Sequence, residues 1–117
     1  YVSYRPDFDL LFQCADVFID SFPVSSALTQ IDLMRNKVAS VVKINKDKPE
    51  FSFHEYQMPD YPYMFEDVKD MEKAICELLY DENKRKEIIE KNYQYWLSTY
   101  ESSVVRDKYV EIIEGDR

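Results

Sequence analysis

The spacing of apolar residues changes several times between Ala15 and Ile44, and this change predicts a strand, a helix and a second strand. Val17-Phe18-Ile19 is an uninterrupted apolar run that ends at Asp20, as in a buried strand. Residues 27–36 have helical periodicity, and residues 38–44 return to a mostly β-branched run. The apolar positions of the expected helix are Leu28, Ile31 and Met34. We therefore predict a βαβ unit with two parallel strands and a crossover helix.

Further strands are expected on both sides of this unit. Tyr1 to Tyr4 is strand-like, and residues 7–14 read as a short helix that leads into Ala15. Residues 17–20 should form the central strand, because this run alone lacks a polar residue. Ile19→Ala would then cost about 2–4 kcal/mol of stability. Residues 61–65 are expected to form a short edge strand, because Pro62 cannot donate a backbone hydrogen bond.

Three helices are predicted after Phe65. The first begins near Asp67, the second near Asp81 and the third at Ser102, and each carries apolar residues at helical spacing. We expect these helices to pack on the sheet and on each other, with Trp96 at least half buried. Between the two halves of the chain, the aromatic residues of loop 45–58 are read as anchors of that loop rather than as a platform for a sugar ring.

Composition excludes several classes of function. The chain has 117 residues, enough for one domain, and a formal net charge of −8. Lys84-Arg85-Lys86 alternates with glutamates, as on a solvated helix face, so nucleic acid is not an expected partner. No apolar run is long enough to span a membrane. Cys14 and Cys76 lack metal-binding spacing and are expected to be reduced, near-core thiols of a cytoplasmic protein.

The candidate chemistry lies between the first strand and the first helix of the βαβ unit. Ser25 and Ser26 would sit at the carboxyl end of a parallel strand, where a helix N-terminus attracts phosphates. The backbone N–H groups of Ala27 and Leu28, with the Ser26 hydroxyl, could donate to phosphate oxygens, and Thr29 could add a second hydroxyl. Asp32 shares a helix face with Thr29 and could accept hydrogen bonds from a ribose diol. The residues alone leave open that a serine is only a helix cap and Asp32 a solvated side chain.

These residues resemble a known family. The segment "ADVFIDSFPVSSALTQIDLMRNKVASVV" is similar to the donor-binding segment in the C-terminal domain of GT-B glycosyltransferases. Asp32-Leu33-Met34 falls on that family's Glu-Ala-Met, and Ala39-Ser40-Val41 falls on its Pro-Val-Val. Residues 29–33 also resemble the "T-G-M-D-V" of protein O-linked N-acetylglucosamine transferases.

The resemblance implies a fold, a domain organisation and a function. The fold would be α/β and partly Rossmann-like, with a short parallel sheet and C-terminal helices. Residues 1–117 would form one domain, the later part of a GT-B donor-binding domain, with a βαβ core (1–65) and C-terminal helices (66–117). The full-length protein would transfer a sugar from a nucleotide-sugar donor to an unknown acceptor, in cell-surface polysaccharide synthesis. We expect the acceptor site in a missing N-terminal domain, no activity from residues 1–117 alone, and no metal or other cofactor.

The segment also departs from the family pattern. Val24 stands where the common version has a glutamate, and Ser25, Ala27 and Lys37 replace glycines. A side chain restricts backbone approach to phosphate, and Lys37 would be strained in a left-handed turn. The catalytic residues cannot be assigned from the sequence. Two alternatives stay open: a degenerate, non-catalytic GT-B-like interaction module, and an unrelated flavodoxin-like domain.

Overall fold

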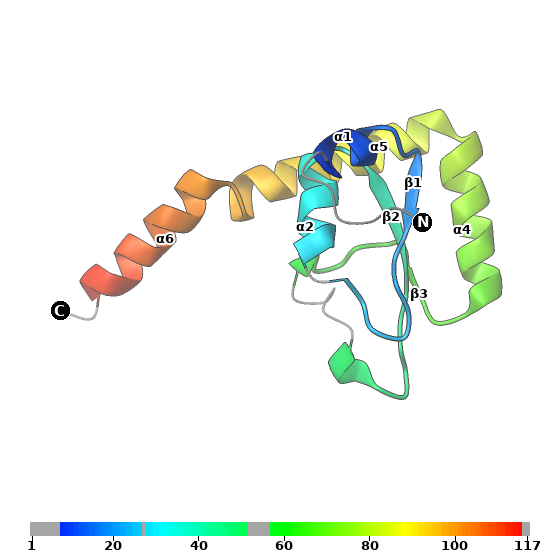
Figure 1. Cartoon of the computed structure of the whole chain (residues 1–117), viewed down its shortest axis with the longest axis horizontal. Coiled ribbons are helices and arrows are strands. Elements are labelled where there is room, and N and C mark those ends of the chain that lie inside the picture. The colour runs from blue at the N-terminus through cyan, green and yellow to red at the C-terminus, as the bar shows by residue number, and fades with distance from the viewer. Residues whose placement is uncertain (1–7, 27, 52–56, 116–117) are drawn as a thin grey trace.

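The computed structural model describes residues 8–26, 28–51 and 57–115 and has an α/β fold (Figure 1). The predictions for residues 1–4, for Ala27 and for the loop aromatics Phe53 and Tyr56 lie outside the described residues. The elements in chain order are α1 (Phe8–Gln13), β1 (Val17–Ile19), α2 (Leu28–Arg35), β2 (Ala39–Lys43), the 3-10 helix η1 (Pro49–Phe51), β3 (Met64–Phe65), α4 (Val68–Tyr80), α5 (Glu82–Thr99) and α6 (Ser102–Gly115).

The sheet has three strands in the order β1-β2-β3, and both pairings are parallel. Val17 pairs with Ala39 and Ile19 with Val41, so α2 connects two adjacent parallel strands. Val42 pairs with Met64, which places β3 on the other side of β2. The predicted βαβ unit and the predicted short strand within residues 61–65 are both confirmed.

The prediction that residues 17–20 form the central strand is wrong for the part of the chain that the structure describes. β2 lies between β1 and β3, and its first four residues are all buried. In β1, by contrast, Ile19 is 53% exposed. Ser40 made β2 look less buried in the sequence. Its hydroxyl is accommodated because it donates to the Gln30 Oε1 atom at 2.9 Å.

α2 buries a face that overlaps only in part with the one that its apolar residues predicted, because Met34 and Ile31 pack on the core but Leu28 does not. Gln30, Leu33 and Met34 are buried, whereas Leu28 is 75% exposed. The helix ends in a Schellman-type turn, in which the Val38 N–H donates to the Leu33 carbonyl at 3.0 Å. Lys37 has φ 59 in this turn, the left-handed conformation in which a residue other than glycine is strained. Its ammonium lies 4.5 Å from the centre of the Tyr93 ring, which ties the turn to α5.

α4 and α5 cover the sheet, as predicted. α4 begins at its cap Asp67, whose side chain accepts from the Lys69 N–H at 2.7 Å. α4 contacts all three strands, whereas α5 contacts α2 and β2 and crosses the end of the sheet where the strands begin (Figure 1). Asp81 ends α4 and caps α5. Trp96 is more than half buried against the core, which confirms its predicted burial.

The prediction that all three C-terminal helices pack on the sheet is wrong for α6. It has no buried residue, and it continues away from the body beyond α5 (Figure 1). The change of direction follows Tyr100, whose hydroxyl donates to the Gln57 carbonyl at 2.8 Å. The apolar residues of α6 are consequently exposed, among them Tyr109, Ile112 and Ile113.

The two cysteines do not lie where the sequence placed them. Cys14 and Cys76 are both free and exposed, which corrects their expected near-core position. Cys14 follows the end of α1, and Cys76 lies on the side of α4 turned from the sheet, so the apolar residues around them in the sequence do not cover them.

No helix within the described residues combines the length and the apolarity that a membrane crossing requires.

Candidate functional site

The loop after β1 is held to the loop after β2 by hydrogen bonds. The backbone N–H of Ser25 donates to the Phe51 carbonyl at 2.9 Å, and the Ser25 hydroxyl donates to the same oxygen at 3.0 Å. Asn45 Nδ2 donates to the Pro23 carbonyl at 3.1 Å, and Asn45 Oδ1 accepts from the Lys48 N–H at 3.0 Å. Ser25 and Asn45 are themselves buried. The two loops therefore form one connected surface at the carboxyl end of the sheet.

Asp20 determines the path of the chain from β1 to α2. Asp20 is only 6% exposed, and its Oδ1 atom accepts from the Ser26 N–H at 3.2 Å and also from the Ser26 hydroxyl. A buried carboxylate with N–H and O–H donors replaces the glycines that would otherwise allow so tight a loop. The second of these contacts uses the Ser26 hydroxyl, which the sequence analysis assigned to a phosphate.

The structure also places the remaining predicted site residues. Leu28 is the first residue of α2, and its side chain is exposed, while Ala27 lies outside the described residues. Thr29 is half-buried. The Asp32 side chain is 46% exposed and lies 3.4 Å from the Arg35 guanidinium. Thr29 and Asp32 are three residues apart in the same helix, so the structure keeps them on one face, next to the end of the Ser25–Ser26 loop.

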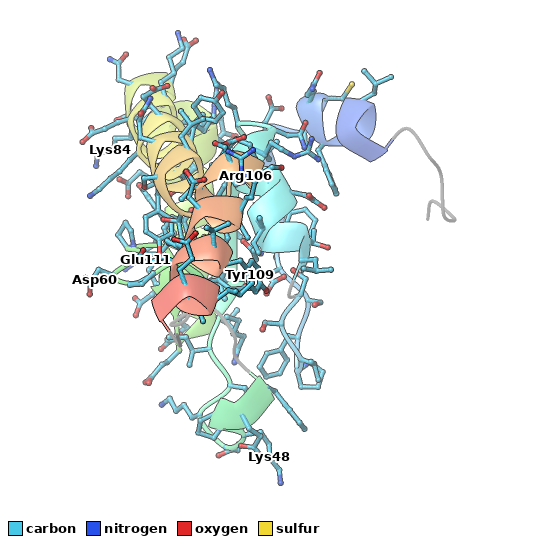
Figure 2. The ribbon with its side chains drawn as sticks, turned by 90° about the vertical axis from the view of Figure 1, so that its left-hand side faces the viewer. Lys48, Asp60, Lys84, Arg106, Tyr109 and Glu111 are labelled. Carbon is cyan, nitrogen blue, oxygen red and sulfur yellow. The ribbon has the colours of Figure 1, made fainter. Side chains whose placement is uncertain are left out.

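Three lysines gather at the same end of the sheet. Lys43 ends β2, and its ammonium lies 4.2 Å from the centre of the Phe22 ring. Lys46 pairs with Glu66 at 3.4 Å. Lys48, labelled in Figure 2, is exposed beside η1 and points away from the body. Their positive charge is offset in the same region by the exposed carboxylates of Asp47 and Glu50 and by Glu66, the partner of Lys46.

Sequence reasoning missed three residues that shape this region: Asp20, Gln30 and Asn45. Asp20 and Asn45 each lie close after a strand, at the edge where parallel sheets bind ligands, and this position was a usable signal. Gln30 gave no such signal, because a glutamine on a helix is ordinarily exposed. Its burial reflects its partner Ser40 on the neighbouring strand.

The donor set offers no cation site. Among the described residues, no three His, Cys, Asp or Glu side chains lie close enough to hold a metal ion. What the region offers instead is backbone donors, a threonine hydroxyl, a carboxylate on α2 and nearby lysines, a set suited to a phosphorylated ligand. Comparisons with protein-family models, with curated proteins and with solved structures found no match to this chain.

Proposed function

We propose that this chain forms the nucleotide-binding part of a glycosyltransferase donor site. The observation that carries the proposal is the parallel β1–α2–β2 unit, with the loop 20–27 at its carboxyl end. In open α/β sheets this position binds nucleotides, because helix N–H groups and dipole favour phosphate there. The resemblance of residues 15–42 to GT-B donor-binding segments gives the sugar nucleotide as the ligand class.

Within this proposal each exposed group has one role. The N–H groups and hydroxyl in the first turn of α2, at Leu28 and Thr29, receive the diphosphate. Asp32, one turn further, accepts hydrogen bonds from the ribose hydroxyls and gives up its ion pair with Arg35. Sugar transfer itself requires an acceptor-binding part, so residues 1–117 alone should be inactive.

Titration calorimetry with UDP and GDP, on the longest form of the protein that contains this chain, tests the proposal. Asp32→Asn keeps the size of the side chain and removes its charge, so it should weaken binding by about 1–3 kcal/mol and leave stability nearly unchanged. The matched control is Asp107→Asn. Asp107 is exposed on α6 and also lies 3.4 Å from an arginine, but it is distant in the fold from α2. Equal affinity in the two variants and the intact protein would remove Asp32 from the site.

Asp20 favours one second candidate, a non-catalytic interaction module. Its carboxylate accepts from both Ser26 donors and so places negative charge where a phosphate would approach. Val24, where the common family pattern has a glutamate, agrees with this reading. If the intact protein binds neither UDP nor GDP, that result would favour the non-catalytic interaction module.

A further inference from the structure

A cavity lies on the side of the structure where α5 crosses the start of the strands, away from the Ser25–Ser26 loop. It has a volume of about 330 Å³ and is formed by residues 58–62, which lead into β3, and by α5. Its apolar walls come from Met58, Tyr61, Pro62, Ile88 and Tyr95. Small-molecule sites start at roughly 300 Å³ and combine apolar walls with a few polar groups. The cavity is therefore large enough for one ring with one polar substituent.

Asn92 supplies a buried donor at this cavity. The residue is only 7% exposed, and it lines the cavity from α5. Among the described residues, no acceptor meets hydrogen-bond geometry with its Nδ2 atom. The neighbouring Tyr61 hydroxyl is already engaged, since it donates to the Ser40 carbonyl at 2.6 Å and accepts from the Ser40 N–H at 3.4 Å. A buried amide without an acceptor costs free energy that a ligand oxygen would recover.

The charged residues at the cavity indicate which ligand oxygen fits best. Lys91 lines the cavity next to Asn92 in sequence, and no ion pair within the described part of the chain engages it. Asp60 also contributes to the lining, but its side chain points outward from the body in Figure 2. A carboxylate would thus meet an amide donor and a nearby ammonium, whereas a protonated amine would meet a like charge at Lys91.

We infer that this cavity binds a small planar apolar molecule bearing one carboxylate, with the ring between Tyr61, Pro62 and Tyr95 and the carboxylate on Asn92 Nδ2 and the Lys91 ammonium. The site is independent of the proposed nucleotide site, because it is built from residues 58–62 and α5 rather than from the loops at the carboxyl end. A test of ligand binding in this cavity therefore does not depend on whether the protein binds a nucleotide.

Amide NMR spectra of the full chain, titrated with benzoate, benzamide and benzylamine, test the inference. Benzoate should shift the Asn92 side-chain amide and the backbone amides of residues 58–62, and it should bind at least about threefold more tightly than benzamide. Benzylamine should bind most weakly. Equal affinity for benzoate and benzylamine, shifts confined to another region, or no shift at any concentration would overturn it.

Two variants separate the roles of the polar groups. Lys91→Gln, on the exposed rim, should weaken benzoate binding by about threefold to tenfold and leave benzamide binding unchanged. Lys108→Gln, an exposed lysine of α6, is the control and should change neither. Asn92→Leu should weaken both ligands. Because Asn92→Leu alters a buried position, the wild-type preference and Lys91→Gln decide the question if that variant does not fold.

Discussion

The Asp20 carboxylate accepts hydrogen bonds from both the backbone N–H and the hydroxyl of Ser26, six residues later in the chain. This contact closes the turn between β1 and α2. It also sets the charge that any ligand meets there. Ser26→Asp would place two carboxylates side by side, so a loss of nucleotide binding in that variant would be mixed with a loss of stability.

Asp20→Ala should lower the free energy of unfolding by about 1–3 kcal/mol, because the Ser26 N–H loses its acceptor in a part-buried position. Ser26→Ala should cost less, since the N–H contact stays. Ser103→Ala is the control: Ser103 makes the same pair of contacts to Glu101, but on the exposed surface. Urea unfolding would give the three values. Wild-type stability in Asp20→Ala would show that the contact does not hold the loop.

Ser40→Ala should destabilise the protein by about 1–2 kcal/mol, because the Gln30 Oε1 atom, in a fully buried residue, loses its donor. Gln30 Nε2 already lacks a partner among the described residues. Adding Gln30→Met to Ser40→Ala should therefore recover part of the loss, since both polar groups are then removed. Thermal and urea unfolding of the wild type, the Ser40→Ala and Gln30→Met single variants and the double variant would measure these differences as a double-mutant cycle. A double variant less stable than Ser40→Ala would contradict this account.

Val41→Ala should cost about 2–3 kcal/mol, because Val41 is fully buried in the central strand β2. Ile19→Ala should cost less than about 1 kcal/mol, since Ile19 is 53% exposed. This reverses the larger cost that the sequence alone suggested for Ile19. Unfolding by urea measures both, and an Ile19→Ala loss equal to that of Val41→Ala would mean that β1 is covered on its exposed face.

The free energy of unfolding should fall in alkaline solution because the buried Tyr61 phenol ionises. Burial, opposed by hydrogen bonding to Ser40, raises the pKa of this phenol above its ordinary value of 10.0. Above about pH 10 the unfolded chain loses the proton that the folded protein keeps, so the stabilisation is complete below that pH and is lost as the pH rises through the folded pKa.

Urea midpoints between pH 8 and 11 would measure this effect. The wild type should lose more stability over this range than Tyr61→Phe does. Tyr80→Phe, at a tyrosine that is 87% exposed, should follow the wild type. Parallel pH profiles for the wild type and Tyr61→Phe would exclude Tyr61 as the source of the loss.

The sequence by itself determined the elements that depend on local patterns. The apolar run 17–19, the helical spacing of residues 27–36 and the β-branched run after Val38 specified the β1–α2–β2 unit to within a residue or two. Asp67 and Asp81 marked helix starts because a carboxylate caps N–H groups within its own turn. Lys37 stands where the family pattern has a glycine, and it does take the left-handed conformation in which a side chain is strained.

Only the tertiary structure decided which strand is central, which face of α2 is buried and what the site donors contact. Gln30 is buried because Ser40 faces it from another element, and Ser26 is engaged because the chain returns to Asp20. α6 is amphipathic in sequence, yet it lies outside the core because its packing depends on the position of Tyr100 and Gln57, 43 residues apart in the chain. These contacts join residues six, 10 and 43 positions apart, and local periodicity carries no information about them.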